Sequence, residues 1–240
     1  MDEIAKKLKT ARLPCAAAVI VAAGSGTRFG GDKLMADLGG IPVLAHTLRA
    51  FEAVQAIREI VLVTRREMTE DMAELCRAHS ITKISNIVPG GDTRAQSSLA
   101  GVMAVSPEAE LIAIQDGARP LVTGDIIMDA LWTAYRHMAG VPAVPVRDTV
   151  KQARDGVVEN TPDRSALFAV QTPQCFQADI IRAALMDALQ NAPGVTDDCL
   201  AVERIGGRIY LSEGSEENIK ITTPLDLKLA EMILAERAKQ

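Results

Sequence analysis

Aromatic side chains are scarce in this chain of 240 residues, where Phe, Trp and Tyr together make up 3%. Hydrophobic residues still reach 48%, so Ala, Val and Ile are expected to fill the interior in place of rings. Histidine occurs three times and cysteine four times, and no two cysteines form a C-x-x-C pair. This argues against a zinc site or a disulfide framework, and we expect the cysteines to be buried free thiols.

Long hydrophobic runs and an excess of basic residues are also missing. The formal net charge is −5, which argues against broad, salt-dependent binding to nucleic acid. No apolar run approaches the ~18 residues needed to span a bilayer. The stretch from Cys15 to Ala23 follows several lysines, but it is short and ends in glycines rather than at a cleavage site. It therefore predicts a buried first strand rather than a secretion signal. From these three observations we expect a cytoplasmic protein with no nucleic-acid or membrane partner.

What the sequence does contain is an alternation of short apolar runs and amphipathic stretches. Uniformly apolar strands separated by helices are typical of a parallel sheet covered on both faces. We therefore expect an α/β, Rossmann-like fold with a mostly parallel sheet, whose ligands bind at the carboxyl ends of the strands. The expected strands are 17–21, 59–64, 83–88, 111–115 and 141–146, and the expected helices are 43–53, 68–79, 93–105 and 126–138.

This alternation breaks after Val146. Residues 147–164 are polar and contain an Asp155-Gly156 turn signal, which predicts a hairpin or protruding arm. Beyond it we expect a helix at 178–191, strands at 208–211 and 219–221, and a last helix that starts at Pro224 after the N-cap Thr223. The length favours a single domain over residues 1–240, with residues 1–14 frayed.

The first expected strand runs into a glycine-rich loop, Ala22-Ala23-Gly24-Ser25-Gly26-Thr27-Arg28, and Lys33 follows. Glycines let backbone N–H groups approach phosphate oxygens, and the two basic side chains add positive charge. A Walker A loop does not fit, because Asp32 follows Gly31 where Lys-Ser/Thr is needed, and Phe29 stands where a dinucleotide loop needs its third glycine. A tight turn without ligand is the alternative, although it has no use for two cations. The loop resembles the A-A-G-x-G-x-R signature of nucleotidyltransferases that activate sugars and sugar alcohols.

Further polar segments follow the later expected strands and the arm. They are 89–98 (PGGDTRAQSS), 116–120 (DGARP), 145–151 (PVRDTVK), 163–164 (DR), 171–174 (QTPQ), 196–198 (TDD) and 218–222 (NIKIT). By the order and spacing of these segments the chain resembles the 2-C-methyl-D-erythritol 4-phosphate cytidylyltransferase family of the non-mevalonate isoprenoid pathway. The resemblance covers roughly residues 16–234 and implies an enzyme, a nucleotidyltransferase.

The resemblance implies a role for each matching residue. Arg28 and Lys33 would stabilise the transition state, while Arg164 and Lys220 would place the substrate phosphate for attack. The nucleotide would be bound by Ala22, Ala23, Gly24, Gly26, Gly91, Asp92 and Ser97. The polyol phosphate would be held by Asp116, Arg119, Thr149, Arg164, Thr172, Thr196 and Lys220. Thr149 and Arg164 lie on the arm, which in this family reaches into the neighbouring subunit of a homodimer.

Several of these residues also have a structural interpretation. Asp92 and Thr196 each precede a helical pattern and would serve as N-caps. Asp116 would pair with Arg119, and Lys220 would be an exposed lysine of a strand in which its two isoleucine neighbours face inward. The chain also departs from the common family pattern, with Asp32-Lys33-Leu34 in place of Pro-Lys-Gln, and Gln115 and Gly117 in place of a His and an Ala beside Asp116.

The implied reaction is attack of a phosphate monoester on the α-phosphorus of CTP with loss of pyrophosphate. Both reactants are anions, so positioning and charge neutralisation should dominate. Mg²⁺, or another divalent cation, would bridge triphosphate oxygens, with Asp116 as the best-placed carboxylate. Two alternatives stay open: transfer to D-ribitol 5-phosphate, which shares the loop and the cytidine site, and a non-catalytic nucleotide-binding module. Arg28, Lys33 and Lys220 together argue against the second alternative.

Overall fold

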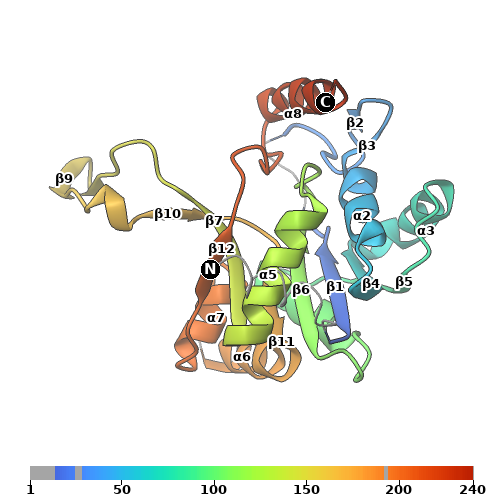
Figure 1. Cartoon of the computed structure of the whole chain (residues 1–240), viewed down its shortest axis with the longest axis horizontal. Helices are drawn as coiled ribbons and strands as arrows, with labels where there is room; N and C mark the ends of the chain where they lie inside the picture. Colours follow the sequence, from blue (N-terminus) through green and yellow to red (C-terminus); the bar gives the residue numbers. More distant parts are fainter. Residues whose placement is uncertain (1–13, 25–28, 192–193, 240) are drawn as a thin grey trace, which may run out of the picture.

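An eight-stranded sheet forms the centre of the computed structural model, which describes residues 14–24, 29–191 and 194–239 (Figure 1). One half of the sheet is parallel and has the order β6-β1-β4-β5. Its strands are β1 (Ala16–Val21), β4 (Ile57–Thr64), β5 (Ile84–Pro89) and β6 (Leu111–Asp116), each within two residues of a predicted run. Long buried runs identify these strands because both faces of a parallel sheet are covered.

The other half of the sheet is mixed. Strand β11 lies between β6 and β7 and is antiparallel to both, while β10 continues along β7 and β12 pairs in parallel with the far side of β7. Their bounds are Ala139–Pro145 for β7, Phe168–Val170 for β10, Gln174–Gln177 for β11 and Tyr210–Glu213 for β12. Neither β10 nor β11 was predicted, because β10 has only three residues and β11 has four with a glutamine at each end.

One predicted strand is wrong. Residues 219–221 have no regular secondary structure, and the strand predicted at 208–211 forms slightly later, as β12. The Ile-Lys-Ile alternation still orients side chains as expected, because Ile221 is buried and Lys220 points the other way, to Asp116. The alternation of apolar and polar residues therefore predicted which side chains are buried, although the segment does not pair with a strand.

Helices cover both faces of the sheet, as predicted. On one face lie α2 (Val43–Ala53), α3 (Thr69–Ala78), α5 (Gly124–His137) and α8 (Pro224–Arg237); on the other lie α4 (Arg94–Met103), α6 (Ala178–Asn191) and α7 (Asp198–Arg204). Strand β1 shows why: Ala16, Ala18 and Ile20 join the first hydrophobic cluster, and Ala17 and Val19 join the second. Successive side chains of a strand point to opposite faces, so each face receives its own core.

Helix caps correct two of the structural interpretations. The N-cap of α4 is Thr93, whose side chain accepts from Gln96 in a capping box, so Asp92 is not the cap. Likewise the N-cap of α7 is Asp197, which accepts from the backbone N–H of Leu200, and not Thr196. The predicted cap Thr223 is confirmed and forms a capping box with Asp226.

The predicted arm contains a hairpin of β8 (Gln152–Arg154) and β9 (Val157–Asn160), which projects away from the body of the molecule (Figure 1). Asp155 and Gly156 turn the chain with positive φ values of 50° and 79°. A short 3-10 helix, Arg164–Ala166, leads back to β10. Val157 and Val158 are 69% and 54% exposed, so the hairpin presents apolar side chains that this chain itself does not cover.

A smaller hairpin of β2 (Asp37–Leu38) and β3 (Ile41–Pro42) precedes α2, and a 3-10 turn at Arg66–Met68 precedes α3. Cys76, Cys175 and Cys199 are buried free thiols, as predicted, whereas Cys15 is partly exposed. Burial raises the pKa of Cys76 to about 11, so this thiol stays protonated at neutral pH. Within the described ranges, each helix is too short or too polar to cross a membrane.

Candidate active site

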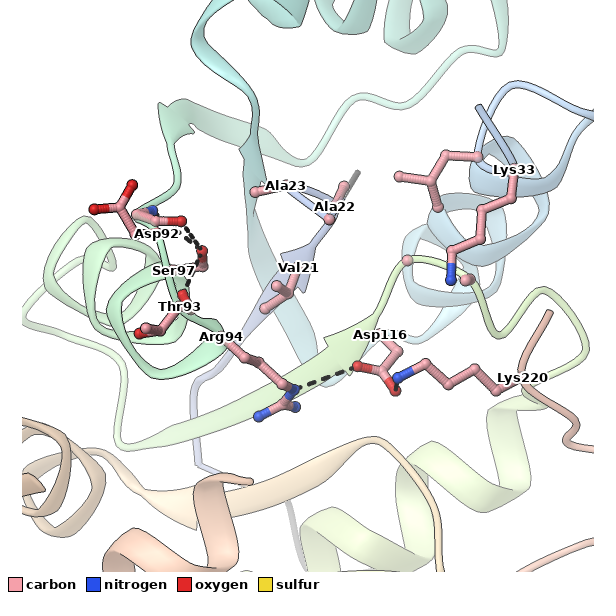
Figure 2. Close-up of a pocket in the computed structure, with 15 residues that line it drawn as sticks. Val21, Ala22, Ala23, Lys33, Asp92, Thr93, Arg94, Ser97, Asp116 and Lys220 are labelled. Atoms are coloured by element: carbon pink, nitrogen blue, oxygen red, sulfur yellow. Dashed lines mark hydrogen bonds and ion pairs between the residues drawn. The ribbon is translucent and has the colours of Figure 1, made fainter. Parts of the chain in front are cut away.

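A pocket of about 430 Å³ opens at the carboxyl ends of the parallel strands, where the sequence predicted the ligand site. Val21 ends β1 and Asp116 ends β6 (Figure 2). The loop after β5 brings in Gly91. The lining residues are Val21, Ala22, Ala23, Gly24, Lys33, Leu34, Gly91, Asp92, Thr93, Arg94, Ser97, Asp116, Gly117, Ala118 and Lys220. Three cations and two carboxylates therefore share a pocket of the size that holds a small molecule.

One wall of the pocket is a tightly packed loop between β5 and α4. The hydroxyl of Ser97, which is 3% exposed, accepts from the backbone N–H of Gly91 at 3.1 Å and lies 3.0 Å from the carbonyl of Thr93. A Cβ on Gly90 would lie 2.5 Å from Cβ of Ala23, so this loop touches the glycine-rich loop as only glycine allows. The wall is thus held rigidly, with Asp92 exposed at its rim.

Asp116 is the electrostatic centre of the pocket (Figure 2). Its Oδ2 lies 2.8 Å from Nζ of Lys220 and 3.7 Å from Nε of Arg119, and its Oδ1 lies 3.6 Å from Nε of Arg94. Burial by itself would raise the pKa of Asp116, but the positive charges of Lys220, Arg94 and Arg119 hold the pKa below its ordinary value. The predicted pairing with Arg119 is therefore present, within a larger ion cluster.

Arg94 lines the pocket but was not among the predicted site residues. Its Nη1 lies 2.6 Å from Oδ2 of Asp198, which is fully buried, and it also reaches Asp116. Burial would lower the pKa of Arg94, but the carboxylates of Asp198 and Asp116 raise it above its ordinary value. Both residues lie in segments that the family resemblance picked out, and a charged residue at each helix start was the signal available.

Asp198 itself is fixed by Gln174 of β11. The Oε1 of Gln174 accepts from the backbone N–H groups of Asp198 and Cys199 at 3.0 and 3.1 Å, and its Nε2 donates to Asp197 at 3.1 Å. The unpredicted strand β11 therefore supports the start of α7 and, through Asp198, the guanidinium at the base of the pocket.

Lys33 enters the pocket from the segment between β1 and β2, and its amino group points toward the side where Asp116 and Lys220 lie (Figure 2). Its neighbour Asp32 accepts from the backbone N–H of Leu34 at 3.1 Å and from Nη2 of Arg65 at 2.6 Å. Asp32, which departs from the family pattern, thus ties the lysine-bearing turn to the residue after β4. This carboxylate stabilises the conformation that directs Lys33 inward.

The structure brings most of the predicted site residues together. Ala22, Ala23, Gly24, Lys33, Gly91, Asp92, Ser97, Asp116 and Lys220 line the pocket. Arg119 and Thr172 lie beneath it, where Arg119 contacts Asp116 and Thr172 Oγ1 accepts from the backbone N–H of Asp116 at 3.2 Å. Gly26 and Arg28 fall outside the described residues.

Three predicted residues are not in the pocket of their own chain. Thr149 and Arg164 are exposed and lie on the arm, where Nη1 of Arg164 donates to the carbonyl of Arg147 at 2.7 Å. Thr196 is exposed before α7 and is absent from the pocket lining. The two arm residues therefore do not contribute to the pocket of their own chain.

The carboxylates limit how a metal ion can be held. Across the described part of the chain, no three His, Cys, Asp or Glu side chains cluster as a metal site. Asp116 faces the pocket, and the 3.6 Å separation of its Oδ1 from Arg94 leaves lone pairs for a cation. Mg²⁺ is commonly bound by one or two carboxylates together with substrate phosphates and water. The pocket thus offers the inward carboxylate of Asp116, and a divalent ion here would need substrate phosphates and water for its remaining ligands.

A model of the 2-C-methyl-D-erythritol 4-phosphate cytidylyltransferase family matches residues 16–236. The chain belongs to this family. A family member from Caldanaerobacter subterraneus subsp. tengcongensis is 44% identical over 90% of this chain and 97% of its own length. Another, from Symbiobacterium thermophilum, is 43% identical over 92% of this chain and 94% of its own length. Nearly full coverage on both sides means that the whole pocket and the arm lie within the matched region.

Solved structures of family members share the fold. The crystal structure of 4-diphosphocytidyl-2C-methyl-D-erythritol synthase from Anaerococcus prevotii has a TM-score of 0.83 at 30% identity, and covers 92% of this chain and 96% of its own. The Thermus thermophilus 2-C-methyl-D-erythritol 4-phosphate cytidylyltransferase has a TM-score of 0.75 at 29% identity over 90% of this chain and 98% of its own. The α/β fold with a mostly parallel sheet is thereby confirmed.

Proposed function

We propose that this chain transfers the cytidylyl group of CTP to 2-C-methyl-D-erythritol 4-phosphate and releases pyrophosphate, a step in the formation of isoprenoid precursors. The observation that carries the proposal is the ion cluster at the carboxyl ends of β1 and β6. Arg94 and Lys220 of this cluster line one pocket together with Lys33, in a chain whose relatives are named for this reaction.

The reaction itself calls for cations more than for a base. A phosphate monoester is largely ionised at neutral pH, so its oxygen can attack the α-phosphorus directly. A new P–O bond forms to the polyol phosphate, the bond between the α-phosphorus and the bridging oxygen breaks, and pyrophosphate carries the electron pair away. Lys33 and Lys220 would neutralise the charge that builds up, together with Arg28 of the glycine-rich loop.

Asp116 has two tasks in this scheme. It holds Lys220 in the pocket through the 2.8 Å ion pair, and it is the carboxylate available to a divalent ion. When bound, Mg²⁺ would supply charge neutralisation for the triphosphate, with Asp116 as its protein ligand. Because the pKa of Asp116 is held below its ordinary value, the carboxylate is ionised throughout the neutral range.

The base would lie against the loop between β5 and α4. Asp92 and the carbonyl of Gly91 would offer acceptors to the exocyclic amine of cytosine, and Ser97 fixes that backbone by accepting from the N–H of Gly91. A misplaced base would leave polar groups unpaired at about 1–3 kcal/mol each. We therefore infer a preference for CTP over UTP and ATP.

The arm would complete the site of a second chain. Its hairpin exposes Val157 and Val158, and a short exposed hairpin is marginally stable by itself. A two-fold dimer through this arm would bury the valines and bring Arg164 and Thr149 to the neighbouring pocket twice over, since such an interface is self-complementary. We place the enzyme in the cytoplasm, where CTP and polyol phosphates are formed.

Pyrophosphate release with CTP and each of two acceptors tests the proposal. We expect turnover with 2-C-methyl-D-erythritol 4-phosphate to exceed turnover with D-ribitol 5-phosphate by orders of magnitude in kcat/KM. The reverse order would establish the ribitol phosphate enzyme instead, and nucleotide binding without turnover of either acceptor would favour the non-catalytic module. Replacement of CTP by UTP or ATP with equal rates would contradict the assigned base site.

A further inference from the structure

Lys220 lies on a segment that lacks a strand, and yet its amino group is placed within 2.8 Å of Asp116. In a sheet the backbone ladder would set the direction of such a side chain. Here residues 215–221 follow β12 without pairing to it, and Ile221 donates to the carbonyl of Ala118 at 2.8 Å. A lysine side chain has many rotamers, so its position must be set by what fixes this segment.

Two buried carboxamides fix it. Gln171, which is 7% exposed, donates through Nε2 to the carbonyl of Ser215 at 2.7 Å and accepts at Oε1 from the N–H of Ser215 at 3.3 Å. Asn218 is fully buried, and its Nδ2 donates to Oε1 of Gln171 at 3.2 Å and to the carbonyl of Thr172 at 3.0 Å. Gln171 is in turn anchored to β7, because its N–H donates to the carbonyl of Pro142 at 2.8 Å.

Thr172, which follows Gln171, also holds Asp116, the partner of Lys220 in the ion pair. Thr172 accepts the Nδ2 proton of Asn218 at its carbonyl and the N–H of Asp116 at its hydroxyl, 3.2 Å away. Arg119 makes a second connection, since its Nη1 donates to the carbonyl of Asn218 at 2.7 Å and its Nε lies 3.7 Å from Asp116. Hydrogen bonds of residues 171 and 172 therefore hold both the segment that carries Lys220 and the backbone of Asp116.

We propose that Gln171 and Asn218 are positioning residues for Lys220. Their paired carboxamides set the place of the Lys220 amino group relative to Asp116, and they do so from outside the pocket, since neither lines it. Nε2 of Gln171 donates once, Nδ2 of Asn218 donates twice and Oε1 of Gln171 accepts twice, so the arrangement is held at several points rather than one. Among the described residues, Oδ1 of Asn218 is buried without a hydrogen-bond partner. The inference rests on the proposed function in so far as Lys220 acts on the reacting phosphates.

The kinetic test places Asn218→Ala and Gln171→Met in two backgrounds, the natural chain and Lys220→Ala. Each single change should lower kcat about 10- to 100-fold, the range expected when a charged group is displaced by about 1 Å. Lys220→Ala should lower kcat about 10²–10³-fold. In the Lys220→Ala background the two changes should cost less than about threefold more, because there is no amino group left to misplace. Losses that multiply would overturn the proposal.

Asn86→Ala is a control for the loss of an asparagine hydrogen bond away from the pocket. Nδ2 of Asn86 also donates to a backbone carbonyl, that of Ala104 at 3.0 Å, but it lies on β5 at the opposite edge of the sheet. In the natural chain, Asn86→Ala should leave kcat unchanged. In the Lys220→Ala background, it should leave kcat at the value of Lys220→Ala alone. If Asn86→Ala reproduces the loss seen with Asn218→Ala, the effect is one of general stability and the positioning role is refuted.

A second measurement does not depend on turnover. With 13C-labelled lysine, the Cε–Hε signal of Lys220 can be assigned from its disappearance in Lys220→Arg. We expect Asn218→Ala and Gln171→Met to move this signal to the position of exposed lysines while thermal unfolding stays cooperative. An unmoved signal would refute the positioning role even in an active enzyme. The converse result is a natural chain that turns over neither acceptor while the two variants still move the Lys220 signal. That result would refute the proposed function and leave the positioning role supported.

Discussion

Arg94, at the start of α4, places its Nη1 2.6 Å from Oδ2 of Asp198, at the start of α7. The two residues lie 104 positions apart in the sequence, and Asp198 has no exposed surface. A guanidinium at the base of the pocket is therefore neutralised from below while it contacts Asp116 from the side.

Removal of this buried carboxylate should be costly. Asp198→Ala leaves Arg94 with its longer contact to Asp116, and breaking a buried pair by deleting one partner costs about 3–5 kcal/mol. The free energy of unfolding in urea measures the loss. Glu236→Ala, which removes the exposed partner of Lys239, is the control and should change stability by less than about 1 kcal/mol. Equal effects of the two variants would mean that the buried pair contributes nothing special.

Acid should erase the contribution of Asp116 to stability. The cations around Asp116 hold its pKa below its ordinary value, so its charge stabilises the folded state above the unfolded pKa of about 3.9. As pH falls below about 4 and through the lower folded pKa, this stabilisation is lost. The gap in unfolding free energy between the natural chain and Asp116→Asn should thus be constant above pH 5 and narrow below pH 4. A gap of the same size at both ends of the range would contradict the depressed pKa.

Lys33→Ala separates chemistry from binding. A cation that neutralises charge built up during transfer should cost kcat at least about 100-fold when removed. CTP binding should weaken less, because the backbone of the glycine-rich loop remains. Steady-state kinetics with CTP as the varied substrate checks this, with the exposed Lys239→Ala as a control of unchanged kcat. A raised KM with normal kcat would make Lys33 a ground-state contact.

Gly90→Ala tests the contact between the two loops of the pocket. The added Cβ would lie 2.5 Å from Cβ of Ala23 and 2.8 Å from Oγ of Ser97, so one loop must move. Overpacking of this kind costs about 1–3 kcal/mol, and we expect CTP affinity by calorimetry to fall by about tenfold or more. Gly124→Ala is the control, since its Cβ would meet Val54 at an ordinary 3.7 Å. Unchanged CTP affinity in Gly90→Ala would show that the two loops can move apart without affecting the nucleotide site.

Mixed dimers test whether the arm completes the neighbouring pocket. An Arg164→Ala chain and a Lys33→Ala chain should each have little activity alone. A heterodimer of the two would contain one site with both lesions and one site with neither, so co-refolding should recover a substantial fraction of activity. The measurement is pyrophosphate release from mixtures in which mass spectrometry detects the heterodimer. Absence of recovery in such mixtures would assign Arg164 to its own chain or to no site.

The sequence by itself determined the parallel half of the sheet, its helices and the place of the pocket. Strands such as β1 and β6 are buried on both faces, so an uninterrupted apolar run identifies them without knowledge of their neighbours. Glycines and charged residues that follow such strands must gather at one edge of the sheet. Lys33 was predicted from the glycine-rich loop, and Gly91 and Asp116 were assigned to the site by the family resemblance; the structure places all three in one pocket.

Tertiary structure alone decided the rest. β11 is a strand because β6 and β7 flank it, and residues 219–221 form none because their backbone pairs elsewhere. Likewise Arg94 meets Asp198, and Gln171 meets Asn218, only when the fold has brought distant segments together. A local pattern of apolar residues predicts that a segment is buried, because burial stabilises it against any apolar surface. The partner of a buried polar group depends instead on geometry between segments, since a hydrogen bond or ion pair requires a particular atom within about 3 Å.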